Sequence, residues 1–236
     1  MENDISTLLT AAATIGFVHT VLGPDHYLPF VVMSKSGRWS MAKTSLVTFI
    51  CGVGHVAGSI ILGLIGVSLG LALAKLEAFE AFRGDLAGWG LVILGLGYTA
   101  WGILHALKNK PHTHLHHHPD GEHEHLHEHV DEHGHVHEVK GKALFSPWAL
   151  FIIFVFGPCE ALIPLLMYPA AEGSTLGLAM VTLVFAVTTI GTMLVIVLGA
   201  SYGLKMIPMN KLERFTHAFA GFTILLCGVA IQILGL

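Results

Sequence analysis

Two short stretches of this chain combine a helix-breaking Gly-Pro pair with side chains that bind metal ions. The first, from His19 to His26, reads HTVLGPDH, and the second, from Gly157 to Glu160, reads GPCE. Both lie inside long apolar runs, where a proline removes a backbone hydrogen bond and bends the helix. Two such breaks in corresponding membrane helices are typical of a transport site near the middle of the bilayer.

The first stretch supplies three potential ligands, His19, Asp25 and His26. In an unbroken helix the two histidines would lie about 10 Å apart along the axis, too far apart to share one ion. Gly23 allows unusual backbone angles and Pro24 interrupts the helix. A break here folds His19 back toward the Asp25-His26 pair.

Other candidates come from the next apolar segment and from the second stretch. His55 follows a Gly-Val-Gly run, and Cys159 and Glu160 follow the break at Gly157 and Pro158. Imidazole, carboxylate and thiol together suit Ni(II), Co(II), Zn(II) or Fe(II) better than Mg(II) or Ca(II). The alternative for each residue is structural, such as a hydrogen bond to a neighbouring helix or apolar packing of the cysteine. The metal site that we expect consists of His19, Asp25, His26, His55, Cys159 and Glu160.

The composition predicts an all-α polytopic membrane protein. Mean hydropathy is +0.70, and charged residues make up 12% of the chain, against about 25% in soluble domains. The net charge of −4 indicates no nucleic-acid partner, and no feature indicates an enzyme or an organic cofactor. Six apolar segments approach or exceed the ~20 residues of a bilayer crossing: 5–33, 44–74, 86–107, 145–171, 175–204 and 212–236.

The two halves of the chain repeat one another. The Gly-Pro pairs lie 134 positions apart, and Lys75-Leu76-Glu77 recurs as Lys211-Leu212-Glu213. Because each half has three crossings, the second enters the membrane from the opposite face. We therefore expect two inverted three-helix repeats with broken first helices, at 1–107 and 145–236, joined by a loop at 108–144.

In the repeat, a pair of threonines in the second half stands at the position of a histidine in the first half. Thr189, next to Thr188, corresponds to His55 in the other half. The pair is a candidate for the transport pathway, although threonines in membrane helices also bond to carbonyls of their own helix.

Lysine and arginine predict the orientation. Ten of the twelve lie in the loops after the first, third and fifth segments, and two lie on the opposite side. The positive-inside rule puts both termini outside and the 108–144 loop in the cytoplasm, in a prokaryotic-type cytoplasmic membrane.

The cytoplasmic loop is rich in histidine and acidic residues. Such a tract is expected to be disordered and to bind transition metals loosely, or else to act as a solvated, pH-responsive linker. Its histidines are His112, His114, His116, His117, His118, His123, His125, His127, His129, His133, His135 and His137.

The chain resembles the NicO/NiCoT-like nickel/cobalt transporter superfamily. The resemblance rests on HTVLGPDH (19–26), GVGH (52–55), Pro158-Cys159 and the histidine-rich loop. It implies transport of Ni²⁺ or Co²⁺ as substrate, with His19, Asp25, His26 and His55 selecting the ion. His19 and Asp25 enclose five residues, whereas the uptake permeases have four at this place. The cytoplasmic metal-collecting loop favours export, and uptake for a metalloenzyme, as in urease-accessory membrane proteins, stays open.

A second resemblance gives the rival hypothesis. The Gly-Pro-Cys of 157–159, within a three-plus-three repeat, is similar to the DsbD/CcdA thiol–disulfide electron carriers. Those proteins use one cysteine in the first segment of each half, and the matching position in the first half here is Asp25. A metal sensor without transport is a third reading. The oligomeric state is not predicted.

Overall fold

The chain forms a bundle of long helices. The computed structural model describes residues 2–108, 112–118, 121–127, 147–157, 159, 161–206 and 213–234. In the first half, the elements are α1 (Glu2–Leu22), the 3₁₀ turn η1 (Pro24–His26), α2 (Leu28–Ser36), α3 (Met41–Ser68) and α4 (Leu73–Lys108). In the second half, they are α5 (Pro147–Phe156), α6 (Leu162–Ala171), α7 (Thr175–Met206), the 3₁₀ turn η2 (Glu213–Phe215) and α8 (Thr216–Leu234).

Five of the six expected membrane crossings are present as long helices. Among the described residues, five helices are long and apolar enough to cross a bilayer: α1, α3, α4, α7 and α8. The apolar segment predicted at 145–171 is divided into α5 and α6, which are each shorter than a crossing. The polytopic helical membrane protein expected from composition is thus confirmed, and with it the lipid bilayer as a partner.

Both Gly-Pro pairs break a helix. At the first, the Gly23 N–H still donates to the His19 carbonyl (3.0 Å), but the His26 N–H donates to the Gly23 carbonyl (3.1 Å), so the chain tightens into η1. Pro24 causes this change because it has no N–H to continue the α-helix. The second break separates α5 from α6, and the Leu162 N–H donates to the Cys159 carbonyl (3.0 Å).

The two broken segments differ in length. Helix α1 has 21 residues before its break, whereas α5 has 10. The break therefore comes near the end of the first segment and in the middle of the second.

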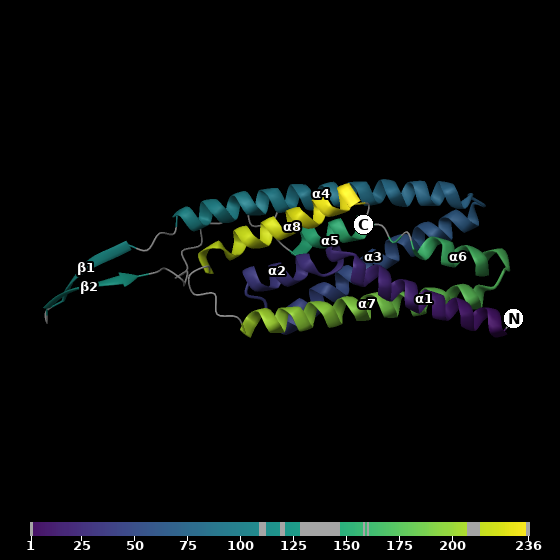
Figure 1. The fold of residues 1–236 in the computed structure, drawn as a ribbon, viewed down its shortest axis with the longest axis horizontal. Coiled ribbons are helices and arrows are strands. Elements are labelled where there is room, and N and C mark those ends of the chain that lie inside the picture. The colour runs from purple at the N-terminus through teal and green to yellow at the C-terminus, as the bar shows by residue number, and fades with distance from the viewer. Residues whose placement is uncertain are drawn as a thin grey trace.

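Helices distant in sequence pack side by side (Figure 1). Helices α4 and α8 lie along one side of the bundle and make its most extensive contact, while α1 packs against α7 on the opposite side. Helices α2, α3 and α5 lie between these pairs, and α3 contacts both α5 and α7. This arrangement brings both breaks into the interior.

Helix α4 corrects one expectation. The sequence predicted a third segment beginning at residue 86 and an outer loop containing Glu80 and Arg83. Instead α4 begins at Leu73, and both charged side chains are buried. A hydropathy profile scores every charged residue as exposed. An ion pair whose remaining hydrogen bonds are satisfied can nevertheless be buried in a helix bundle.

Two short pieces of the histidine-rich loop are among the described residues, and the disorder of the loop stays a prediction. The backbone forms two antiparallel strands, β1 (His112–His118) and β2 (Gly121–His127), with His116 opposite His123. Extended pairing needs only backbone groups, which this polar sequence also provides. The rest of the loop lies outside the described residues.

Candidate functional site

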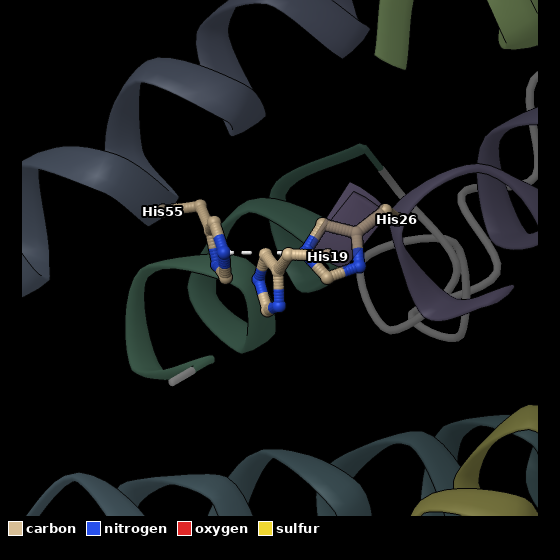
Figure 2. Close-up of side chains that lie close together, drawn as sticks. All are labelled: His19, His26 and His55. Atoms are coloured by element: carbon tan, nitrogen blue, oxygen red, sulfur yellow. Dashed lines mark hydrogen bonds between the residues drawn. The ribbon is translucent and has the colours of Figure 1, made fainter. Parts of the chain in front are cut away.

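Three histidines from two segments meet inside the bundle (Figure 2). His19 lies in the last turn of α1, His26 ends η1, and His55 lies within α3. The Nε2 atoms of His26 and His55 are 3.3 Å apart. One ring nitrogen from each of the three residues lies within 4.8 Å of the others. We call these residues the histidine trio.

The first break orients His26. Its Nδ1 lies 3.0 Å from Asp25 Oδ1 and 3.2 Å from the Gly23 carbonyl oxygen. Two acceptors at one nitrogen favour the tautomer with the proton on Nδ1, which leaves the Nε2 lone pair facing His55. A Cβ on Gly23 would come within 2.4 Å of His26 Nδ1, so only glycine permits this arrangement.

His55 connects the trio to the second break. The side chain is buried, and its Nδ1 makes no hydrogen bond of normal geometry with any described residue. A Cβ added to Gly157 would lie 3.1 Å from that Nδ1, so the second break lies against this imidazole. Its ring also packs edge-on near Phe154 of α5, with ring centroids 6.0 Å apart.

Cys159 lies at the second break, next to His19. Its Sγ is 4.0 Å from His19 Nε2, and the residue is fully buried. The Cys159 N–H donates to Glu80 Oε2 (3.1 Å) of α4. The hydrogen bond between the Cys159 amide and Glu80 therefore holds the thiol next to the His19 imidazole.

Glu80 belongs to a buried ion pair that the sequence interpretation missed. Arg83, one turn later on α4, pairs with Glu80 Oε1, and its Nη2 donates to the Val155 carbonyl at the end of α5 (2.8 Å). Ser59 of α3 also donates to Glu80 Oε2 (3.1 Å). An oppositely charged i, i+3 pair flanked by apolar residues was the available signal.

A cavity adjoins the trio and both breaks. Its volume is about 600 Å³, and its lining includes the histidine trio, Asp25, Gly23 and Gly157. Residues of α4 and α8 close the other side, among them Leu91 and Ile231. This volume lies within the range of about 300–1,000 Å³ found for small-molecule sites.

The other predicted residues contribute less or lie outside the described chain. Thr189 is buried against Gly16 of α1, Thr188 is half-buried, and neither lines this cavity. Pro158 and Glu160 lie outside the described residues, as do the side chains of the histidine-rich loop. Of the six expected ligands, the structure thus places His19, Asp25, His26, His55 and Cys159 around one site.

The residues at this site provide two kinds of chemistry. Three neighbouring imidazoles can donate lone pairs to a metal ion. A thiol next to an imidazole can lose its proton and act as a nucleophile. Both activities draw on His19, which belongs to the trio and also lies next to Cys159.

Comparison with known proteins identifies a family. A family model described as "Cytochrome C biogenesis protein transmembrane region" matches residues 28–230, a range that includes His55 and Cys159 and begins after His26. No curated protein and no solved structure matches the chain. The expected membership of the nickel/cobalt transporter superfamily is therefore wrong, and so is metal-ion transport as the function. The Gly-Pro-Asp-His motif suggested a nickel/cobalt transporter because clustered histidines suit a metal ion in a protein of any family.

Proposed function

Because the chain belongs to the family of cytochrome c biogenesis protein transmembrane regions, we propose that it carries reducing equivalents across the membrane by thiol–disulfide exchange at Cys159. The observation that carries this proposal is the 4.0 Å approach of Cys159 Sγ to His19 Nε2, beside the cavity. From the sequence alone, thiol–disulfide transfer is the alternative to metal transport.

His19 serves as the base for this thiol. Thiol–disulfide exchange needs the thiolate, and a neutral imidazole at this distance can take the proton from Sγ. Among the described residues, Cys159 is the one cysteine whose Sγ lies next to an imidazole. Cys51 is buried in the apolar cluster around Phe30, and Cys227 is buried in α8.

The arrangement favours a route that uses one cysteine. Asp25 occupies the place where the related carriers have their first cysteine, and Cys51 and Cys159 belong to separate apolar clusters. An internal disulfide between two thiols at the breaks is thus not the carrier. In place of such a disulfide, we propose a small disulfide substrate in the cavity; His19 lines it, as do Gly157 and Ala161 on either side of Cys159 in the sequence, and the thiol itself lies behind this lining.

The exchange then has two balanced steps. The Cys159 thiolate attacks a small disulfide R′S–SR′ from one face, forming the mixed disulfide Cys159–S–S–R′ and releasing R′S⁻, which takes up the proton from His19. A small thiol RSH from the other face attacks the R′ sulfur, releasing Cys159 as the thiol and R–S–S–R′. One turn thus oxidises RSH on one face and releases R′SH on the other, while the second R′S group crosses to the RSH face as part of R–S–S–R′.

The topology of the carrier follows the sequence interpretation. We place both termini outside and residues 108–144 in the cytoplasm, because ten of the twelve lysines and arginines lie on that side. Two inverted repeats, rocking about the breaks, would open the cavity to each face in turn. The packing of α1 on α7, of α5 on α3 and of α4 on α8 supports this arrangement.

Flux in vesicles tests the proposal. Proteoliposomes contain reduced glutathione, and a membrane-impermeant aromatic disulfide is added outside. The protein should release the coloured aromatic thiol outside, and Cys159→Ser should fall to the rate of protein-free vesicles. The double variant Cys51→Ser/Cys227→Ser is the matched control and should keep the wild-type rate. Full activity in Cys159→Ser would overturn the assignment.

A second candidate function is the binding of a transition-metal ion by the histidine trio. In a tetrahedral site with metal–nitrogen bonds of about 2.0–2.1 Å, two ligand atoms lie about 3.3 Å apart. The Nε2 atoms of His26 and His55 have that separation. With His19 moved inward and Cys159 as a fourth ligand, the site would suit Zn(II), Co(II) or Cu(I).

Cobalt spectroscopy distinguishes this site from the loop. A thiolate ligand gives Co(II) a charge-transfer band, and the histidine-rich loop contains no cysteine. We expect the band in the wild-type protein and its loss in Cys159→Ser. Histidine-only spectra in both proteins would exclude Cys159 from the site.

A further inference from the structure

We propose that the buried Glu80–Arg83 pair of α4 is a positioning device that holds the second break and sets the place of the Cys159 thiol. The catalytic significance of this pair rests on the proposed exchange at Cys159, whereas its effect on the thiol's surroundings can be measured separately. Neither residue belongs to the two Gly-Pro motifs, and neither lines the cavity.

Glu80 binds the backbone of the reacting residue. Its Oε2 accepts the Cys159 N–H (3.1 Å) and the Ser59 hydroxyl (3.1 Å), and its Oε1 accepts from Arg83. The carboxylate is fully buried. Because both oxygens are engaged, Glu80 has a fixed orientation, and through the amide it fixes Cys159.

Arg83 binds the other side of the same break. Helix α5 ends at Phe156, and its last carbonyls lack partners within the helix. The guanidinium Nη2 donates to the Val155 carbonyl (2.8 Å) and reaches the Gly157 carbonyl (3.4 Å). The ion pair thus binds carbonyls before the break and the amide after it.

The neighbouring helix makes room for this contact. A Cβ on Gly58 of α3 would lie 2.6 Å from Arg83 Nη2 and 2.9 Å from the Val155 carbonyl oxygen. Arg83 therefore passes through a gap that only glycine leaves open.

The energetics favour a positioning role over simple packing. A buried ion pair costs several kcal/mol of desolvation per ion, and apolar residues of similar size often stabilise a protein as well or better. What Glu80 and Arg83 provide, and apolar side chains cannot, is hydrogen bonding to the amide and carbonyls freed by the break. At the first break, His26 itself bonds to the Gly23 carbonyl and to Asp25. At the second break, the bonds to the Cys159 amide and the Val155 carbonyl come from Glu80 and Arg83 of α4.

Alkylation of the three cysteines in one molecule tests the inference. The full-length protein is treated with N-ethylmaleimide, and modification of Cys51, Cys159 and Cys227 is followed by peptide mass spectrometry. The variants are Glu80→Gln, which removes the charge, and Arg83→Lys, which keeps the charge but loses the fork. Glu77→Gln is the matched control, because Glu77 lies on the same helix and is exposed.

The expected result is selective. Gln offers one acceptor oxygen where Glu80 has two, so either Arg83 or the Cys159 amide loses a buried hydrogen-bond partner; this costs about 1–3 kcal/mol, and Glu80→Gln should speed alkylation of Cys159 by about tenfold or more. Arg83→Lys should give a smaller increase, and Glu77→Gln should match the wild type. Cys51 and Cys227 should keep their wild-type rates in every variant.

Two outcomes would overturn the inference: an unchanged rate at Cys159 in Glu80→Gln, or an equal increase at all three cysteines, which indicates general loosening. Flux in the vesicle assay should also fall by about tenfold or more in Glu80→Gln, since a misplaced reactive group loses that much rate. If wild-type vesicles show no exchange, the proposed function fails, and the labelling pattern still decides the role of the ion pair.

Discussion

His26 and His55 face each other with their Nε2 atoms 3.3 Å apart, although 29 positions separate them in the sequence. The contact joins the break after α1 to the middle of α3. Since Gly157 lies against the other nitrogen of the same His55 ring, one imidazole touches both broken segments. His55 therefore links the two breaks, as the contact between His19 and Cys159 also does.

Removing His55 should weaken metal binding at the trio. His55→Gln keeps most of the side-chain volume but removes an imidazole ligand. The affinity for Co(II) at the trio should fall at least about tenfold, so one tightly bound equivalent should disappear from the titration. The weaker equivalents of the histidine-rich loop should remain. His217→Gln, on α8, is the control and should keep the tight equivalent, and equal titrations for both variants would contradict the trio as the tight site.

Much of the site followed from residue types and spacing. The Gly-Pro pairs predicted both breaks, and His19, Asp25, His26, His55 and Cys159 were all expected at one place. These residues were recognisable because polar groups inside apolar segments need a partner or a function. The sequence also predicted the bundle's long helices from their length and hydropathy.

The remaining features depended on three-dimensional contacts. The sequence predicts a loop at Glu80 and Arg83, because a hydropathy profile cannot show that two charges neutralise each other within α4. The family was misassigned because His19, Asp25 and His26 suit a metal, while the chemistry of Cys159 depends on an imidazole 140 positions away. That neighbour is visible only after folding.

The contact between α4 and α8 should not tolerate a methyl group at Gly95. A Cβ there would lie 2.2 Å from the Leu225 amide nitrogen, so the two backbones would have to separate. Small residues allow membrane helices to approach this closely. Gly95→Ala should lower the free energy of unfolding by about 1–3 kcal/mol, measured by denaturant titration in detergent micelles.

Gly199→Ala on α7 is the control for that change, because nothing lies within 4 Å of its added Cβ. It should leave the stability unchanged or raise it by about 0.5–1 kcal/mol, as alanine does at an open helix position. Equal losses in the two variants would mean that helix propensity, and not the α4–α8 contact, determines the effect.

The hydroxyl of Tyr98 should contribute to stability. It lies 2.7 Å from His217 Nδ1 on α8 and 3.0 Å from Ser36 Oγ at the end of α2, so it links three helices. Tyr98→Phe leaves both partners buried or half-buried without it and should cost about 1–3 kcal/mol of unfolding free energy. Tyr202→Phe, at an exposed position of α7, should cost less than about 0.5 kcal/mol. A Tyr98→Phe protein as stable as the wild type would show that the hydroxyl contributes nothing to helix packing.

Gly58→Ala should separate the ion pair from the second break without changing any charge. The new methyl group would lie 2.6 Å from Arg83 Nη2 and 2.9 Å from the Val155 carbonyl oxygen, so the guanidinium must withdraw or α3 must move away from α5. Either change weakens the hydrogen bond to Val155, and overpacking of this kind costs about 1–3 kcal/mol. We expect faster maleimide labelling of Cys159 and a lower unfolding free energy. Gly191→Ala, with open space around its Cβ, should change neither. If Gly58→Ala lowers stability but leaves Cys159 labelling at the wild-type rate, the gap at Gly58 serves helix packing alone and not the placement of the thiol.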